Sequence, residues 1–251
     1  MRLTVIGCSG SFPGPLSAAS CYLLEDEHEG RTWRVLLDLG SGAFGTLQKY
    51  VDVSAIDAVC FTHLHADHCL DLTGYYVVRR YHATSPWPRL PVYGPVGTAE
   101  RMAKAYDLDP DPGMNEEFDF REWDGPITVG PFSIEPFSVA HPVTAFSLRI
   151  KSGGSVLAYS GDTGPCEGLE AAAEGADLFL AEASFVGTRE NPPDLHLTGR
   201  QAGEVAKRAG AGRLVLTHIP PWHNRQTALD EAHGVFDGPI NLAETGQVYE
   251  F

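Results

Sequence analysis

The sequence has few basic residues, and it lacks long apolar runs. Its 251 residues contain 18 Lys and Arg against 33 Asp and Glu, which gives a formal net charge of −15. A surface this acidic repels polyanions, so broad contact with nucleic acid or with an anionic membrane is not expected. No stretch approaches the length of a membrane span, and residues 1–7 predict a first strand and not a signal segment.

Cysteine pairs with regular spacing are also missing. The five cysteines are an odd number without a CxxC pattern, which argues against a disulfide framework and a structural zinc knuckle. A reducing compartment, the cytoplasm, is therefore expected. The sequence also has no low-complexity tract, fixed repeat or long polar linker, so a single domain over residues 1–251 is predicted.

Short apolar runs alternate with helix-like segments along the chain. Hydrophobic residues make up 43% of the sequence, enough for a large core. A hairpin turn is predicted at residues 152–155, and Thr198 with Gln201 forms a capping box that begins a helix ending near Gly210. The mixture indicates layered α/β packing. The predicted strands cover residues 3–6, 35–39, 58–62, 139–140, 156–159, 178–181 and 214–217.

The string His-Leu-His-Ala-Asp-His at residues 63–68 follows the predicted strand 58–62. Three imidazoles and one carboxylate within six residues are typical of a nitrogen and oxygen metal site. A loop at the end of a strand can turn such side chains toward two neighbouring ions. A solvated histidine-rich turn is the alternative for this string.

This string resembles the HxHxDH signature of the metallo-β-lactamase superfamily. Asp38, His141, Asp162 in Gly-Asp-Thr, and His218 resemble the first, third, fourth and fifth motifs of that family, in the expected order. The resemblance covers nearly the whole chain. It implies an α/β fold of the αββα type, in which two mixed sheets lie face to face and helices flank them.

The resemblance also implies a binuclear metal site. His63, His65 and His141 would hold the first ion, Asp67, His68 and His218 the second, and Asp162 would bridge both. Two ions held about 3.5–4 Å apart activate water and neutralise charge on the attacking and leaving oxygens. Divalent zinc is the expected metal, although manganese or iron would also suit His and Asp ligands. Asp38 is interpreted as a residue that orients a ligand.

Two further segments resemble the phosphodiesterase branch of the superfamily, which contains tRNA 3′-processing endonucleases and related cyclic-nucleotide enzymes. Glu182 lies in an Asp-Leu…Glu-Ala strand, and His196 lies in a His-Leu-Thr motif before a helix. In that branch such a pair delivers a proton beside the metals, so Glu182 and His196 are predicted to be catalytic. Asp67 of the HxHxDH string is the third predicted catalytic side chain. A surface histidine beside a helix cap is the alternative reading of His196.

The substrate prediction depends on what separates His141 from Asp162. These positions are only 21 residues apart, which leaves no space for the tRNA-clamping arm that tRNA-processing enzymes usually carry there. Residues 2–11, 63–72, 192–197 and 217–222 resemble an actinobacterial group associated with 3′,5′-cyclic AMP hydrolysis. A small nucleotide is therefore the expected partner, and the expected reaction converts cyclic AMP to 5′-AMP.

Several alternatives remain open at this stage. They are a ribonuclease Z-like tRNA 3′ endonuclease, a lactonase or thioesterase of the same fold, and a non-catalytic scaffold. The scaffold is disfavoured, because a suitable residue is present at every expected ligand position. The resemblance is compatible with a homodimer. Trp222 and Arg225 follow the last metal motif, and they are interpreted either as contacts to base and phosphate or as parts of a packed corner.

Overall fold

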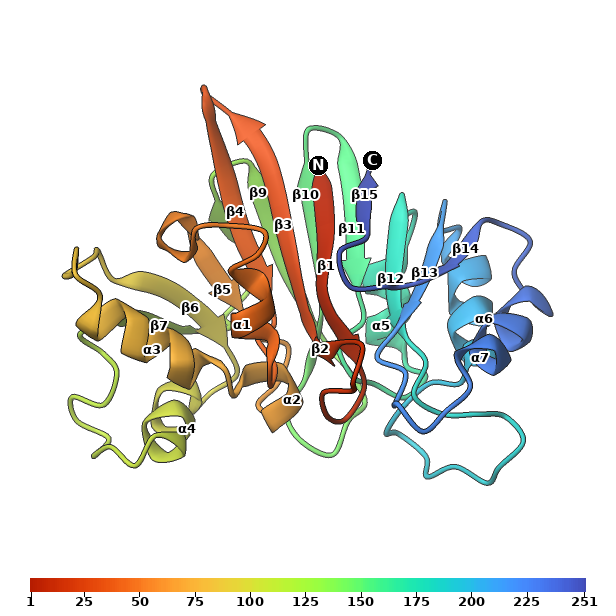
Figure 1. Ribbon diagram of the computed structural model, residues 1–251. Helices are drawn as coiled ribbons and strands as arrows, with labels where there is room; N and C mark the ends of the chain where they lie inside the picture. The colour runs from red at the N-terminus through yellow and green to blue at the C-terminus, as the bar shows by residue number, and fades with distance from the viewer.

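Two β-sheets lie face to face at the centre of the molecule, with helices on their outer faces (Figure 1). The computed structural model describes residues 1–251. The first sheet consists of β15 (Val248–Glu250), β1 (Arg2–Ser9), β3 (Cys21–His28), β4 (Arg31–Leu37), β5 (Ala58–Cys60), β6 (Leu90–Gly94) and β7 (Phe118–Glu122), in that order, with β2 (Ala18–Ala19) paired to β1. The second consists of β14 (Ile240–Leu242), β13 (Leu214–Thr217), β12 (Leu178–Glu182), β11 (Ser155–Tyr159), β10 (Phe146–Ser152), β9 (Phe132–Ser138) and β8 (Ile127–Val129).

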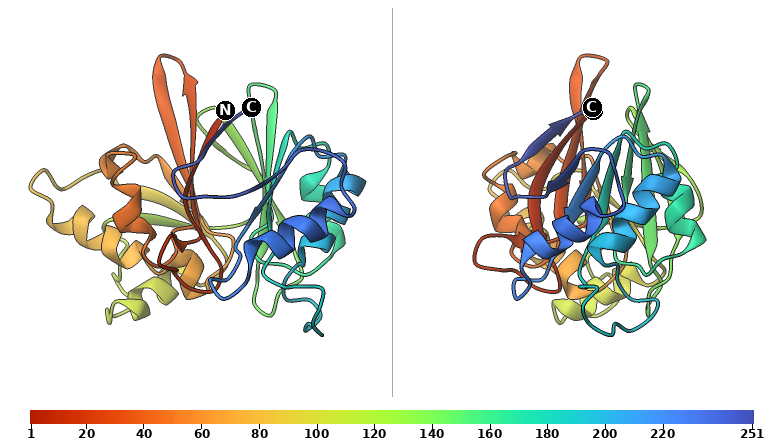
Figure 2. Two further views of the ribbon diagram at one scale, coloured as in Figure 1. Left: turned by 45° about the vertical axis from the view of Figure 1, so that its right-hand side comes forward. Right: turned by 90° about the vertical axis from the view of Figure 1, so that its right-hand side faces the viewer.

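The helices divide between the two outer faces, as the views in Figure 2 also show. Phe44, Tyr75 and Met102 join the core on the outer side of the first sheet, and Leu169 and Val205 join the core outside the second. This arrangement confirms the predicted αββα sandwich. No helix combines the length and the apolar character needed to cross a bilayer. The helices are α1 (Ala43–Leu47), α2 (Ala66–Cys69), α3 (Leu72–Tyr81), α4 (Thr98–Ala105), α5 (Glu167–Ala173), α6 (Gly199–Ala209) and α7 (Arg225–His233), with a 3₁₀ turn, η1 (Val53–Ala55).

The direction of the strands brings polar side chains from both sheets to one end of the sandwich. β4, β5 and β6 are parallel in the first sheet, and β11, β12 and β13 are parallel in the second. All residues of β12 and β13 are buried, as expected for parallel strands that are covered on both faces. The carboxyl ends of these strands lie at the end opposite the two termini (Figure 1).

Two local predictions are confirmed and two are corrected. Gly153 and Gly154 turn the β10–β11 hairpin with φ values of 56° and 96°, and Thr198 and Gln201 form the predicted capping box of α6. Residues 139–140 are not a strand, because β9 ends at Ser138 and the chain turns there toward His141 and Pro142. β5 also ends before residue 62.

Candidate metal centre and active site

The predicted metal ligands come from loops that leave the strands at the shared end of the sandwich. The structure places His63, His65, His141 and Asp162 in one group and Asp67, His68, Asp162 and His218 in another, with the ligand atoms of each group within 4.8 Å of one another. Asp162 therefore belongs to both groups. All seven predicted ligands are brought together, although they span most of the length of the chain.

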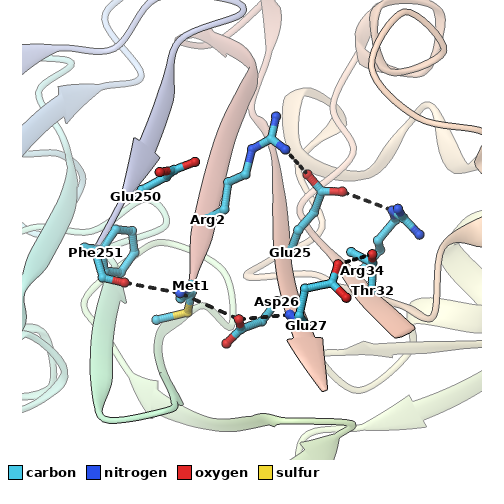
Figure 3. Close-up of a pocket in the computed structure, with 9 residues that line it drawn as sticks. All are labelled: Met1, Arg2, Glu25, Asp26, Glu27, Thr32, Arg34, Glu250 and Phe251. Atoms are coloured by element: carbon cyan, nitrogen blue, oxygen red, sulfur yellow. Dashed lines mark hydrogen bonds and ion pairs between the residues drawn. The ribbon is translucent and has the colours of Figure 1, made fainter. Parts of the chain in front are cut away.

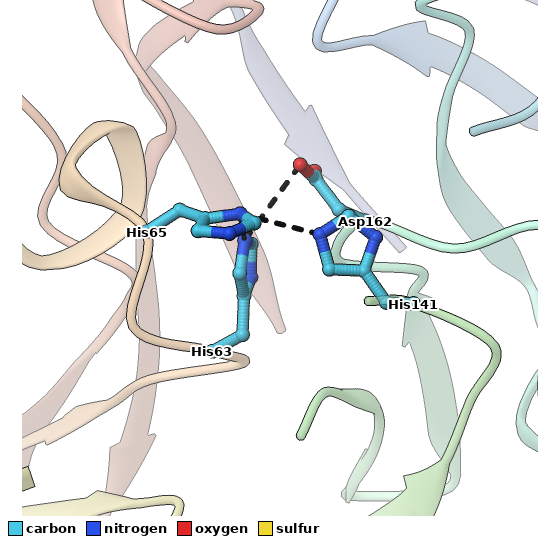
Figure 4. A group of neighbouring side chains, drawn as sticks. All are labelled: His63, His65, His141 and Asp162. Carbon is cyan, nitrogen blue, oxygen red and sulfur yellow. Dashed lines mark hydrogen bonds and ion pairs between the residues drawn. The ribbon is translucent and has the colours of Figure 1, made fainter. Parts of the chain in front are cut away.

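In the first group, three imidazoles from two loops converge (Figure 4). His65 Nδ1 lies 3.0 Å from His63 Nε2 and 3.2 Å from His141 Nε2. The Oδ2 atom of Asp162 lies 3.7 Å from His63 Nε2. Three imidazole nitrogens and a carboxylate that converge in this way form a donor set suited to a divalent ion.

The second group is more deeply buried. His68 Nε2 lies 3.2 Å from His218 Nε2, and Asp67 Oδ2 lies 3.1 Å from the same His218 nitrogen. The Oδ1 atom of Asp162 lies 3.1 Å from His68 Nε2 and 3.4 Å from His218 Nε2. Two imidazoles and two carboxylates converge here, so this group also has the composition of a metal site.

The polar atoms of Asp162 show that a cation fits between the groups. Its Oδ1 is buried and has no hydrogen-bond partner, because the nearby imidazoles do not meet it with donor geometry. Burial opposes ionisation of this carboxyl, but His218, His68 and His63 outweigh burial and hold its pKa well below the usual range. A buried anionic oxygen without a partner is costly. Metal ions in both groups would satisfy it.

The outward-facing nitrogens of four ligands are fixed by hydrogen bonds. Such contacts set the tautomer and the direction of the ring, and they leave the Nε2 atoms aimed inward. Sequence reasoning missed Thr62, Ser184 and the Leu195 carbonyl as partners of this kind. The partners are Thr62 Oγ1 for His63 Nδ1 (3.1 Å), Asp38 Oδ2 for His68 Nδ1 (2.7 Å), the Leu195 carbonyl for His141 Nδ1 (3.0 Å) and Ser184 Oγ for His218 Nδ1 (2.7 Å).

Asp38 links the two metal groups. Its carboxylate accepts from the Thr62 backbone N–H at 2.8 Å, the Thr62 hydroxyl at 2.9 Å and the Tyr159 hydroxyl at 2.7 Å, in addition to contacting His68. Through Thr62 it acts on His63 in the first group, and it acts on His68 in the second directly. The bond from Thr62 N to Asp38 also replaces a strand hydrogen bond, which explains why β5 ends at Cys60.

Replacing Asp38 by asparagine should weaken metal binding without removing a ligand. We expect about a 10–100-fold loss of affinity, because the amide cannot accept from all the donors that the carboxylate serves. Competition with a chromophoric chelator measures this change, and thermal unfolding of the same samples checks folding. Asp237→Ala is the matched control, since the Asp237 side chain is 93% exposed. Unchanged affinity in Asp38→Asn would remove Asp38 from this role.

Backbone geometry at the strand ends also serves the site. Asp38 and His218 both adopt left-handed backbone conformations, with φ values of 57° and 53°. Such conformations are uncommon outside glycine and concentrate at functional sites. Gly161 precedes Asp162 with φ of 57°, and a Cβ there would lie 2.9 Å from Thr62 Cβ. Glycine is required at this position so that Asp162 can approach the loop after β5.

Glu182, which is buried, and His196, which is partly exposed, form a pair beside the metal groups. His196 Nδ1 lies 2.9 Å from Glu182 Oε1, and Glu182 also accepts from the backbone N–H groups of Thr163 and Ser184. Because an ionised carboxylate only accepts, Nδ1 carries a proton and Nε2 is left for a substrate. Burial favours the neutral ring, but Glu182 outweighs burial and raises the pKa of His196 to about 9.

A hollow of about 340 Å³ opens beside His196. It reaches Ser184 at the inner end and Arg189, Trp222 and His223 at the rim. Arg225 does not contribute, because its guanidinium donates to the Ala243 carbonyl, away from this hollow. The phosphate-binding interpretation of Arg225 is therefore wrong. Arg189 is the arginine at the rim, and no motif in the sequence identified it.

A larger hollow of about 410 Å³ lies at the other end of the sandwich (Figure 3). It is bounded by the start of β1 and by the β3–β4 strands, and the eight residues of β1 separate it from the metal groups by about 25 Å. Several of its charges are paired with one another, including the Met1 amino group with Asp26 and Arg34 with Glu25. This hollow is therefore not part of the candidate active site.

An αββα sandwich with two His and Asp groups that share an aspartate defines a metallo-hydrolase of the metallo-β-lactamase fold. The sequence agrees, since residues 33–219 match the family model of the beta-lactamase superfamily domain. The chain belongs to this superfamily. Its family is one of metallo-hydrolases, and it is therefore an enzyme.

Three relatives show how the similarity is distributed. The protein Rv1339 of Mycobacterium tuberculosis is 45% identical over all of this chain and 92% of its own length. The probable metallo-hydrolase YhfI of Bacillus subtilis is 32% identical over the whole of both chains, and its crystal structure covers 99% of each with a TM-score of 0.87. The ribonuclease Z of Mycolicibacterium gilvum is 32% identical over 88% of this chain and 85% of its own.

Proposed function

We propose that this chain is a binuclear metal-dependent phosphodiesterase that hydrolyses a small phosphodiester, 3′,5′-cyclic AMP, to 5′-AMP. The observation that carries the proposal is the position of His196. A protonated imidazole, held by Glu182 at 2.9 Å, lies beside two ligand groups that share Asp162. Two metals and a separate proton donor are what hydrolysis of a phosphodiester with a poor leaving group requires.

The two ligand groups have the membership that the sequence analysis assigned to two metal ions. His63, His65 and His141 would hold one ion, Asp67, His68 and His218 the other, and Asp162 both. When bound, such ions supply an activated water and neutralise charge on the phosphate oxygens. Zinc is the metal that we propose for this donor set, and manganese and iron are the alternatives.

The residues of the chain perform the proton transfer and the orientation. Conversion of cyclic AMP to 5′-AMP adds the oxygen of water to phosphorus and breaks the bond from phosphorus to O3′. The departing O3′ must gain a proton, and His196 Nε2 donates it, while Glu182 keeps the ring in the charged form. Asp38 and Ser184 hold His68 and His218 in the orientation that the metals need.

The dimensions and charge of the site support a small substrate. The hollow beside His196 has about 340 Å³, which is near the lower end for small-molecule sites. The interval from His141 to Asp162 is occupied by β10 and β11, both within the second sheet, so no arm projects from it. The net charge of −15 disfavours a long polyanion. A small nucleotide is therefore the proposed partner, and an extended nucleic acid is not.

Two alternatives are ranked below this proposal. A tRNA 3′ endonuclease is favoured by the 32% identity to a ribonuclease Z, and it is disfavoured by the missing arm. A lactonase or thioesterase would need a wide apolar pocket, whereas the hollow beside His196 contains Arg189, Glu190 and Asn191. Hydrolysis of a lactone or a thioester would also leave the Glu182–His196 pair without this role. All five cysteines are free thiols, which supports the cytoplasm as the compartment.

Product analysis tests the proposed reaction. Metal-loaded protein is incubated separately with cyclic AMP, 2′,3′-cyclic nucleotides and a precursor tRNA, and the products are separated by chromatography and gel electrophoresis. We expect 5′-AMP from cyclic AMP and little or no processing of the tRNA. Efficient cleavage on the 3′ side of the tRNA, with cyclic AMP left intact, would establish the endonuclease in its place.

A further inference from the structure

Two exposed aromatic rings lie together next to the hollow beside His196, and one of them, Trp222, lines it. Trp222 is 60% exposed and Phe12 is 41% exposed, and their ring centroids are 5.1 Å apart with an interplanar angle of 35°. Neither ring belongs to a buried core cluster. Large aromatic rings that stay exposed and lie outside the core clusters are poorly explained by folding, and they are typical of a binding surface.

The backbone holds this pair next to a metal ligand. The loop after β1 is fixed to the segment after β13, because Gly10 N donates to the Ile219 carbonyl at 3.3 Å and Ser11 N lies 3.4 Å from His218 Nε2. A Cβ at Gly10 would lie 2.2 Å from the His218 carbonyl oxygen, so only glycine permits this approach. Phe12 and Trp222 therefore follow two backbone segments that are locked together at His218.

The same hollow reaches the proton donor. Its lining includes Trp222 and Ser11 as well as Ser184 and His196. Phe185 closes the side near His196, with its ring perpendicular to the imidazole at a centroid distance of 5.0 Å. A ligand with a phosphate at the metal groups and a leaving oxygen at His196 would place its next ring system in this hollow.

We propose that Phe12 and Trp222 form the platform on which the base of the nucleotide substrate stacks. The inference rests on the proposed function, since it assumes that the reacting phosphate belongs to a nucleotide. Every base has a π face, and stacking grows with the size of the ring system. The platform therefore selects purine over pyrimidine cyclic nucleotides, and it acts on substrate binding without taking part in proton transfer.

The other hollow beside the metal groups lacks such a surface. It has about 450 Å³ next to His65, and its side chains include Leu64, Val96 and Val143 but no phenylalanine, tyrosine or tryptophan. Aliphatic walls bury apolar groups but cannot stack on a planar base. This comparison assigns the base to the side of Trp222, which is also the side of His196.

Trp222→Ala tests the platform. We expect the KM for cyclic AMP to rise about 5–150-fold with little change in kcat, which is the range for one stacked base. Trp222→Phe should restore most of the binding, because it keeps an aromatic face. Preference for cyclic AMP over cyclic UMP should fall in Trp222→Ala. Tyr81→Ala is the matched control, since Tyr81 is 69% exposed and lies at the end of α3, outside the hollow.

A substrate without a base separates stacking from general damage. The 3′,5′-cyclic phosphate of a ribose analogue that lacks the base should be cleaved equally by the wild type and by Trp222→Ala. Direct binding of 5′-AMP, measured by calorimetry, should weaken in Trp222→Ala and remain unchanged in Tyr81→Ala. Equal 5′-AMP affinity in the wild type and Trp222→Ala, or no 5′-AMP binding by the wild type, overturns the platform.

The calorimetry also distinguishes this inference from the proposed function. If the wild type binds 5′-AMP through Trp222 but does not cleave cyclic AMP, the platform stands and the proposed reaction fails. If cyclic AMP is cleaved as well by Trp222→Ala as by the wild type, with the same KM, the reaction stands and the platform fails.

Discussion

Asp162→Ala is expected to abolish turnover and to weaken metal binding in both ligand groups at once. Asp162 is the residue common to the two groups, with Oδ2 3.7 Å from His63 Nε2 and Oδ1 3.1 Å from His68 Nε2. Metal catalysis contributes several kcal/mol to a reaction of this type, so a loss of about 10³-fold or more in kcat is expected. Metal content, measured by elemental analysis after dialysis, should fall below that of the wild type.

Two controls separate the loss of a ligand from the loss of folding. Asp162→Asn keeps the shape of the side chain and removes its charge, so it should also be inactive while the protein remains folded by circular dichroism. Asp237→Ala removes an exposed carboxylate and should retain wild-type activity and metal content. The bridging role would be rejected if Asp162→Ala kept two ions and the wild-type rate.

His196→Ala should lower kcat for cyclic AMP by about 10²–10⁴, the usual range for a positioned acid, while metal content stays at the wild-type level. His196 is not one of the seven ligands of the two groups that share Asp162, and its Nδ1 is already engaged by Glu182 at 2.9 Å. His82→Ala is the matched control, because His82 is exposed and contacts only its own loop.

Substrates with different leaving groups report on the acid role directly. Bis(p-nitrophenyl) phosphate has a good leaving group that needs little proton donation, so it should lose less activity in His196→Ala than cyclic AMP does. If both substrates lose activity to the same extent, His196 is a phosphate-binding cation and not an acid.

The Glu182 side of the pair has a structural role as well. Both of its oxygens accept from backbone N–H groups, Oε1 from Thr163 and Oε2 from Ser184. The amide of Glu182→Gln would have to point one NH₂ at such a donor, so part of its effect would be a loss of stability. The double variant with His196→Ala should lose less activity than the product of the two single losses, because no imidazole remains for residue 182 to orient.

The charge of His196 also sets a pH dependence. Its pKa is raised to about 9, so the imidazole is protonated at neutral pH and loses its proton as the pH rises through that value. The kcat for cyclic AMP should therefore decline on the alkaline side, and His196→Ala should lack this decline. Divalent ions in the neighbouring groups repel the charged ring and move the decline to lower pH.

The metal ligands could be predicted from the sequence because they follow strands at characteristic spacings. The HxHxDH string and the motifs around His141, Asp162 and His218 identified all seven residues that the structure brings together. The Glu182–His196 contact could also be predicted, since each residue lies in a motif of its own at the end of a strand or before a helix.

The residues that hold those ligands in place could not be predicted in the same way. Tyr159 reaches Asp38 from the opposite sheet, and His141 depends on the carbonyl of Leu195, a backbone atom that has no signature in the sequence. Ser184 lies two residues after Glu182 and could have been suspected, but nothing in the sequence indicates which imidazole it contacts. Two interpretations of Arg225 stayed open, because its distance from His218 in sequence does not reveal the direction of its side chain.

The most direct test of a binuclear phosphodiesterase is the formation of 5′-AMP from cyclic AMP while zinc is titrated into metal-free protein, with bound zinc measured in the same samples. The rate should rise until two ions are bound per chain and then remain constant, because both groups that share Asp162 must be filled. A rate that is complete at one ion, or no 5′-AMP at saturating metal, would contradict the account.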